Sequence, residues 1–183
     1  MSKVIDKLKQ EHAEFRRFLK IFDDELDKFR DGRTPDYEMI DALLDFFTSF
    51  PDEWHHKKED VVYDLLAVKM GLFESGLTDL RSEHLRLETG AKAFGDRIAH
   101  LLGGGELAIQ NILGPGETYS RLLRHHMVKE DQVFFPLAEQ HLTHDDWQSI
   151  EAEISSLRES PAQQAKMDRV RRVARSILEI AAE

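Results

Sequence analysis

The sequence predicts an all-α protein, an antiparallel up-down four-helix bundle with extra helices at its C-terminal end. Apolar residues recur at steps of three and four over four long stretches, which is the period of a helix with one buried face. Short segments rich in glycine or proline separate these stretches, and strand-like alternation is nearly absent. Long helices joined by short breaks favour neighbours that run antiparallel.

The first expected helix covers about residues 5–29, and the second begins near Asp36. The apolar seam of the first helix reads Ile5, Leu8, His12, Phe15, Leu19, Phe22, Leu26 and Phe29. The segment DGRTPD (31–36) ends it, because glycine and proline break helices. The second helix has the seam Ile40, Leu44 and Phe47. Pro51 kinks this helix or starts a new segment, and the seam then continues through His55, Glu59, Val62 and Leu66.

The third helix lies between the break KMGLFESG (69–76) and the stop GGG (103–105). Its seam reads Leu77, Leu80, His84, Leu87, Ala91, Phe94, Ile98 and Leu101. The fourth helix shows Tyr119, Leu123, His126, Glu130, Val133 and Leu137, and GPG (114–116) is expected to interrupt or kink this region. No internal repeat is strong enough to use.

The chain changes character after His141. A short helix follows, with Thr143 or Asp145 near its N-cap, and Pro161 separates it from a last amphipathic helix that carries Met167, Val170, Ala174 and Ile177. We therefore expect a bundle domain over residues 1–142 and a C-terminal helical extension over residues 143–183. The basic stretch RVRRVAR (169–175) is either a solvated helix face or a docking surface for an acidic partner or a second subunit.

Composition limits the functional classes. The 183 residues are 33% charged and 41% hydrophobic, as in a globular domain. The net charge of −10 argues against binding to nucleic acids or anionic membranes. The lack of cysteine excludes disulfides, thiolate metal sites and cysteine nucleophiles. The N-terminus lacks a signal-peptide core, and no apolar run approaches the ~20 residues of a membrane span, so a cytoplasmic location is expected.

Each long helix carries one histidine on its apolar seam. These are His12, His55, His84 and His126. Counting at ~1.5 Å per residue places them at nearly the same level, although the middle connection fits less well. His55 and His126 have a glutamate one turn on, Glu59 and Glu130, and residues at i and i+4 share a helix face. Imidazole nitrogens and carboxylate oxygens together suit iron, manganese or zinc. A cation also explains two inward carboxylates, because a buried unpaired glutamate is costly.

Two histidine doublets occur, and one histidine of each is expected to face inward. His55 and His126 lie on the seams, so we expect their neighbours His56 and His125 to face water. His56 lies about 100° around the helix from His55. His125 shares its face with Lys129. His100, His141 and His144 are expected on the surface.

Four stretches resemble a known family, the hemerythrin-like or HHE cation-binding domains. They are EHAEFRRFL, FPDEWHHKKEDVVYDLL, SEHLRLE and LRHHMVKEDQVFFPLAEQHL, and the resemblance covers about residues 1–142. It implies a four-helix bundle around a non-heme di-iron centre that two carboxylates and an oxo or hydroxo group bridge. It implies Glu59 and Glu130 as the bridging residues. The terminal ligands it implies are His12, His55, His84 and His126. Manganese and zinc are alternatives to the two iron ions.

The chain departs from the oxygen-carrying members at one position. Those proteins have a second histidine one turn after the third-helix histidine, and this chain has Glu88 there. Glu88 either supplies a further carboxylate ligand or turns outward. The iron–sulfur repair branch of the family uses a cysteine-containing N-terminal segment, and the absence of cysteine argues against that branch.

The expected function is binding or sensing of O₂, NO or peroxide at the di-iron centre. Two alternatives stay open: a small di-iron oxidoreductase that consumes peroxide, O₂ or NO, and a metal-binding interaction domain that responds to iron. Whether the chain is an enzyme is left open. The expected partners are a small diatomic or peroxide ligand, and either a second copy of the chain or another protein that docks on the C-terminal helices.

Overall fold

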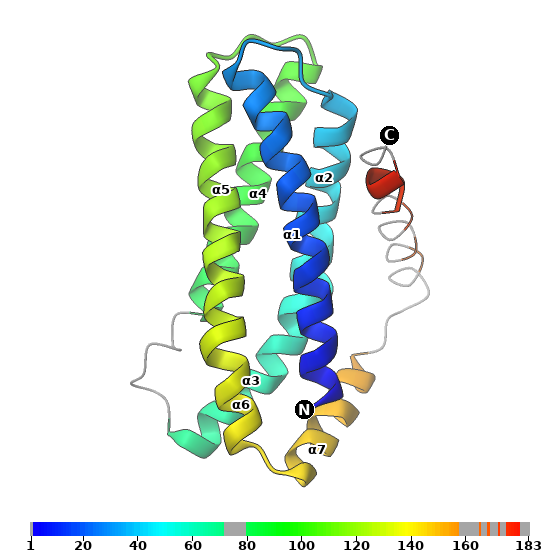
Figure 1. Cartoon of the computed structure of the whole chain (residues 1–183), viewed down its shortest axis with the longest axis vertical. Helices are drawn as coiled ribbons and strands as arrows, with labels where there is room; N and C mark the ends of the chain where they lie inside the picture. The colour runs from blue at the N-terminus through cyan, green and yellow to red at the C-terminus, as the bar shows by residue number, and fades with distance from the viewer. Residues whose placement is uncertain are drawn as a thin grey trace.

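The computed structural model describes residues 2–71 and 80–157 and, near the C-terminus, residues 165, 168, 172 and 175–179. The regular structure of these residues is entirely helical. Four rods stand side by side, and the chain runs up, down, up and down through them (Figure 1). The all-α up-down bundle predicted from the sequence is confirmed. None of the described helices is long and apolar enough to cross a membrane.

The first rod is α1 (Lys3–Arg30), and the second begins with α2 (Tyr37–Phe50). The hydroxyl of Ser2 caps α1 by accepting a hydrogen bond from the N–H of Val4. The carboxylate of Asp36 caps α2 in the same way, accepting from the N–H of Met39 at 2.9 Å. Gly32 between the two helices has a φ of 69°, which glycine adopts without strain. The expected break at 31–36 is therefore confirmed.

The second rod changes its winding at Pro51. A π-helical turn, η1 (Pro51–His55), leads into α3 (His56–Met70), which ends at the left-handed Gly71. Proline has no N–H to donate, so the helical hydrogen-bond pattern is interrupted there. The prediction that Pro51 starts a new segment is confirmed. Single π-turns are frequent at functional sites, and η1 ends on His55.

The third rod is α4 (Leu80–Leu102), which stops before the expected glycines. The fourth rod consists of α5 (Gln110–Lys129), a second π-helical turn, η2 (Glu130–Phe134), and α6 (Phe135–His141). Of the two expectations for GPG (114–116), an interruption or a kink, the interruption is wrong, because α5 runs through Pro115. A Cβ at Gly116 would lie 2.9 Å from a side-chain carbon of Leu26, so this glycine lets α5 approach α1 closely.

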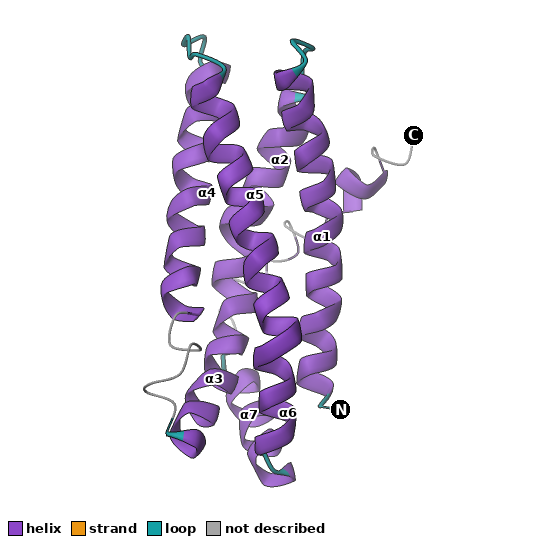
Figure 2. Cartoon of the chain, turned by 60° about the vertical axis from the view of Figure 1, so that its left-hand side comes forward, coloured by secondary structure: helices purple, strands orange, loops and turns teal. Residues whose placement is uncertain are grey.

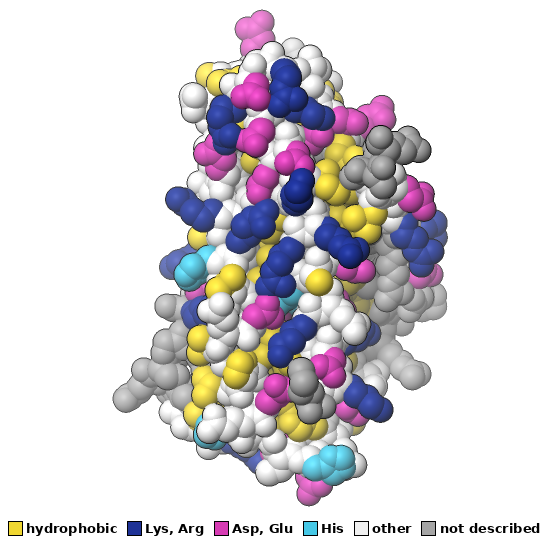
Figure 3. Space-filling model, viewed as in Figure 1, with side chains coloured by type: hydrophobic (Ala, Val, Ile, Leu, Met, Phe, Trp, Pro, Cys, Tyr) yellow, Lys and Arg dark blue, Asp and Glu magenta, His cyan; other side chains and the backbone are white. Residues whose placement is uncertain are grey.

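The described connections lie at the ends of the rods (Figure 2), and charged side chains of both signs cover the α1–α5 face (Figure 3). Two ion pairs join these helices: Arg30 with Glu117 and Arg124 with Asp23, each at 2.7 Å. Exposed pairs of this kind contribute only about 0–1 kcal/mol each. Apolar packing therefore contributes most of the free energy that holds the rods together.

The C-terminal extension packs against the bundle. Its first helix is α7 (His144–Ser156). Thr143 is the N-cap and forms a capping box with Asp146, so of the two predicted caps, Thr143 and Asp145, the first is confirmed. Ile150 of α7 and Ile177 further on are each 1% exposed and belong to the bundle cores. Most of the expected last helix, including Met167, Val170, Ala174 and most of the basic stretch 169–175, lies outside the described residues.

The bundle interior contains two apolar clusters, one toward each end. The larger cluster includes Phe15, Phe47, Leu87 and Leu123. The smaller cluster lies at the other end and includes Leu8, Val62, Leu80 and Phe134. On each rod, the histidine predicted to face inward falls between a residue of one cluster and a residue of the other. A polar layer therefore separates the two apolar clusters.

Candidate metal centre

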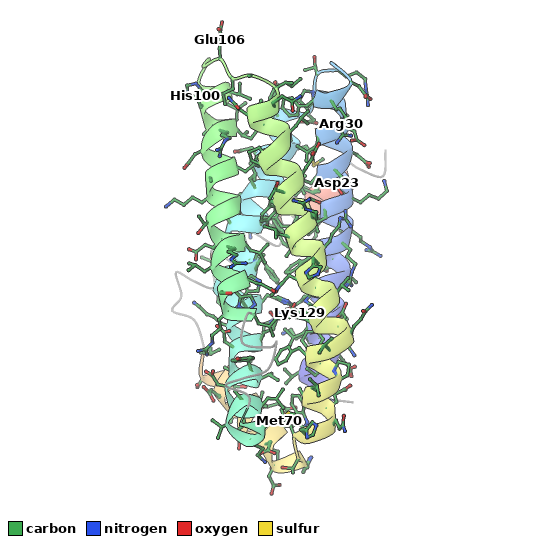
Figure 4. All side chains as sticks on the ribbon, turned by 90° about the vertical axis from the view of Figure 1, so that its left-hand side faces the viewer. Asp23, Arg30, Met70, His100, Glu106 and Lys129 are labelled. Carbon is green, nitrogen blue, oxygen red and sulfur yellow. The ribbon has the colours of Figure 1, made fainter. Side chains whose placement is uncertain are left out.

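Buried histidines and glutamates form this polar layer, which lies at the level of Lys129 in Figure 4. The exposed fractions are 0% for His12 and Glu130, 1% for His55 and Glu59, 2% for His126 and 9% for His84. Each rod contributes at least one of these side chains. The predicted convergence of the four seam histidines and the two glutamates is therefore what the structure shows.

The side chains fall into two groups that could each hold a metal ion. His12, His55, Glu59 and Glu130 make the first group, and His56, Glu59, His84 and His126 make the second. The ligand atoms within each group lie within 4.8 Å of one another. Glu59 belongs to both groups and lies between them.

The two glutamates divide their oxygens between the groups. Glu59 places Oε1 2.9 Å from His55 Nε2 and 3.5 Å from His12 Nε2, and it places Oε2 3.6 Å from His84 Nε2. Glu130 places Oε2 3.3 Å from His12 Nε2 and Oε1 3.1 Å from His126 Nε2. Each carboxylate thus faces the first group with one oxygen and the second group with the other. That is the arrangement needed to bridge two cations.

The inner atoms of this layer fit a metal ion better than they fit one another. Among the described residues, no hydrogen bond reaches either carboxylate oxygen of Glu59 or Glu130, or Nε2 of His12, His55, His84 and His126. These atoms are buried, and a buried polar atom left without a hydrogen bond is costly. Nitrogen and oxygen ligands of this kind suit iron, manganese and zinc, so cations placed among them would satisfy these atoms.

The outer nitrogen of each seam histidine contacts a carboxylate. Two of these contacts come from glutamates: Glu11 lies 2.8 Å from Nδ1 of His55, and Glu83 lies 2.9 Å from Nδ1 of His126. A carboxylate accepts a hydrogen bond from Nδ1–H, so the ring in its neutral form carries its lone pair on Nε2, which faces inward. Both rings are thereby fixed in the tautomer that binds a metal through Nε2.

Aspartates take the same place beside the other two rings. Asp131 lies 3.0 Å from Nδ1 of His12, and Asp60 lies 3.6 Å from Nδ1 of His84. The outer carboxylates are in turn paired with cations: Glu11 with Lys58, Glu83 with Lys129, Asp131 with Arg16 and Asp60 with Arg81. Each histidine is therefore held by a carboxylate that is itself held by a lysine or an arginine.

These contacts reveal an internal repeat, which corrects the expectation that none is usable. Glu11–His12 corresponds to Glu83–His84, and His55-x-x-Lys58-Glu59-Asp60 corresponds to His126-x-x-Lys129-Glu130-Asp131. The contacts of the outer carboxylates with the seam histidines and with Lys58 and Lys129 repeat in both halves, whereas Arg16 and Arg81 do not occupy corresponding positions. The short motifs were visible in the sequence, but their meaning depends on contacts between different rods.

Electrostatics in the layer follow from this pairing. Burial alone lowers the pKa of each seam histidine, but the adjacent carboxylates outweigh it. They raise the pKa of His12 to about 11, of His126 to about 10 and of His84 to about 9. Burial and repulsion from the Glu130 carboxylate raise the pKa of Glu59, but its contacts with His55 and His12 outweigh them and hold that pKa well below its usual range. Protons on the imidazoles thus balance the carboxylates, and cations can replace those protons.

Glu88, the seventh expected ligand, lies outside the layer. Its side chain is exposed and lines a surface cavity of about 610 Å³ between α2 and α4. His84 and Leu87 face the interior, and the inward arc of α4 continues to Ala91 rather than to position 88. Of the two expectations for Glu88, the structure therefore favours the outward orientation. His125, His100, His141 and His144 are exposed, as predicted.

The expectation that His56 faces water is wrong, because its side chain is only 4% exposed. The second rod contacts α1 beside His55 and α4 beside His56, so it buries an arc wide enough to include both histidines. Glu59 lies between them in angle, about 40° from His55 and about 60° from His56. The sequence did contain a signal. In the internal repeat, position 56 corresponds to the apolar Met127, and His125 has no counterpart in the first doublet.

Comparison with family models supports the same view of this layer. Residues 3–138 match the model described as Hemerythrin HHE cation binding domain. No curated protein and no solved structure matched the chain.

Proposed function

Because the chain belongs to the hemerythrin HHE cation-binding domain family, we propose that its polar layer holds two iron ions and binds or senses O₂, NO or peroxide. One observation supports this proposal more strongly than the others. Glu59 and Glu130 each direct one oxygen to the first group and one to the second. A single cation would contact only half of these oxygens, whereas two cations would contact all four.

The residues of the chain have distinct tasks in this proposal. Glu59 and Glu130 would bridge the two ions. The seam histidines would bind through Nε2, because carboxylates hold their Nδ1 atoms. The apolar clusters on both sides exclude bulk water. When bound, a pair of ferrous ions supplies electrons to a small oxidant or a position for a diatomic molecule.

Burial favours a small ligand. The residues that would hold the ions are at most 9% exposed, and His84 is the one nearest to solvent. A molecule the size of O₂, NO or peroxide can reach such a layer through small fluctuations of the rods, whereas a larger substrate requires a wider opening. This burial supports binding or sensing of small molecules.

Anaerobic loading with Fe(II) tests the proposal. We expect two iron ions per chain by elemental analysis, and we expect O₂ or NO to change the visible absorption in a way that removal of the gas reverses. Fewer than two ions per chain would contradict the dinuclear site. Irreversible change with continuous consumption of peroxide, O₂ or NO would instead identify an oxidoreductase. Two ions with no response to any of these molecules would favour an iron-dependent interaction domain.

A further inference from the structure

Within the polar layer, the two halves of the internal repeat differ at one inward position. His56 follows His55 in the first half, and the buried Met127 follows His126 in the second. Each of these two residues lies about 100° around its helix from the preceding seam histidine. For His56, this is the side that faces α4. The surrounding contacts repeat, so this difference gives the layer an asymmetry that its outer carboxylates do not have.

His56 reaches across the layer to the histidines of the second group. Its ring stacks on that of His84, with centroids 3.9 Å apart and an angle of 9° between the planes. It meets the ring of His126 edge to face at 5.6 Å. The rings of His84 and His126 are themselves 4.8 Å apart. Three imidazoles therefore surround one side of Glu59.

We propose that His56 is the third histidine ligand of the second metal position, beside His84 and His126. This inference rests on the proposed function. Ligand atoms of these three residues and of Glu59 lie within 4.8 Å of one another, a spacing that one ion can span with only small side-chain movements. No second histidine stands one turn after His84, where Glu88 is exposed, and His56 approaches the position from a different helix.

Packing alone does not account for an imidazole at this place. Met127 fills the corresponding place in the other half with an apolar side chain that is 1% exposed. A buried imidazole carries two polar nitrogens, so it is a costlier way to fill a core than methionine. The cost is offset if one nitrogen of His56 binds a cation.

The two metal positions are then unequal. The first position has two histidines, His12 and His55, and the second has three. Both positions share the oxygens of Glu59 and Glu130. The position with the additional imidazole binds a given divalent ion more tightly, so the chain fills in two distinguishable steps.

Titration of the metal-free protein with Co(II) tests this inference. We expect two Co(II) ions per chain, bound in two steps by calorimetry. His56→Met copies the residue of the other half, and we expect it to weaken the tighter step at least about tenfold while the weaker step changes little. Met127→His should strengthen the weaker step. His125→Met, in the exposed neighbour of His126, is the control and should change neither step.

A second measurement needs no variant. Ring N–H protons of cobalt-bound histidines give strongly shifted, exchangeable signals in proton NMR, and His56 as a ligand predicts five of them rather than four. Four signals, or unchanged affinities in a folded His56→Met, would overturn the inference about His56 alone. Failure of the unaltered chain to bind two ions would overturn the proposed function first.

Discussion

Oε2 of Glu83 lies 2.9 Å from Nδ1 of His126, across the contact between α4 and α5. Glu11 stands in the same relationship to His55 across the contact between α1 and the second rod. A carboxylate in this position fixes the ring and raises its basicity as a metal ligand. These glutamates lie outside the predicted ligand set, and we expect the affinity of the site for metal ions to depend on them.

Replacing Glu83 should therefore weaken metal binding without removing a ligand. For Glu83→Ala we expect a loss of about 10–100-fold in Co(II) affinity, and for Glu83→Gln a smaller loss, because the amide oxygen still accepts the Nδ1 proton. Glu88→Ala on the same helix is the matched control, since Glu88 is exposed and outside the layer. An equal loss in Glu88→Ala would show that Glu88 is a ligand after all.

The second doublet allows a comparison between adjacent residues. His126→Ala should lose one of the two ions, because His126 is 2% exposed and its Nε2 lies 3.1 Å from Glu130. His125→Ala should retain both, because that side chain is exposed. Elemental analysis after dialysis measures the difference. Equal losses would contradict the assignment of His126 to the layer.

Stability of the metal-free protein should fall as the pH rises above neutrality. The folded-state pKa values of His84, His126 and His12 are about 9, 10 and 11, above the value of 6.5 for a free side chain. Their contribution is fully present below pH 6.5 and is lost as the pH rises through about 9 to 11. Urea unfolding at pH 6, 8 and 10 measures this trend. A midpoint that increases over this range would contradict the pairing.

Metal binding should show the opposite pH dependence. Cations bind neutral imidazoles, so loading must release the protons held by the seam histidines. We expect Co(II) affinity to rise between pH 6 and pH 9. The number of released protons can be measured by calorimetry in buffers of different ionisation enthalpy. Binding without proton release would show that the histidines are already neutral in the metal-free protein.

Two helical glycines, Gly116 of α5 and Gly95 of α4, should respond oppositely to the same substitution. Gly116→Ala places a Cβ 2.9 Å from Leu26 and 3.1 Å from Phe94, and we expect this overpacking to destabilise the fold by about 1–3 kcal/mol. A Cβ at Gly95 in α4 meets nothing within 4 Å beyond its own helix backbone and chain neighbours, so for Gly95→Ala we expect a gain of up to about 1 kcal/mol from helix propensity. Urea unfolding of the metal-free variants compares them. Equal changes would contradict the close approach of α5 to α1.

The sequence predicted the four rods well because each seam records which side of a helix is buried. It also predicted which histidine of each seam meets the others, since helical rise and period convert residue spacing into depth and angle. Glu59 and Glu130 followed from the same reasoning. The breaks at Gly32, Pro51 and Gly104 were predictable because glycine and proline restrict the backbone locally.

The rest depended on contacts between rods. His56 was assigned to water because a single seam was taken as the whole buried face, whereas a rod with neighbours on two sides buries a wider arc. Glu11 and Glu83 look like ordinary charged residues until the facing helix places a histidine beside them. α5 also continues through Pro115, although the glycine and proline of this segment alone predicted a break or a kink.

The polar layer takes at least one histidine from each of four rods, and the chain contains no cysteine. A cation held there would be a cross-link among segments far apart in the sequence, made by coordination rather than by disulfides. Unlike a disulfide, such a link forms only while the rods are assembled, so it stabilises the folded chain in proportion to the logarithm of the free cation concentration. Folding itself would then report how much metal the surroundings contain.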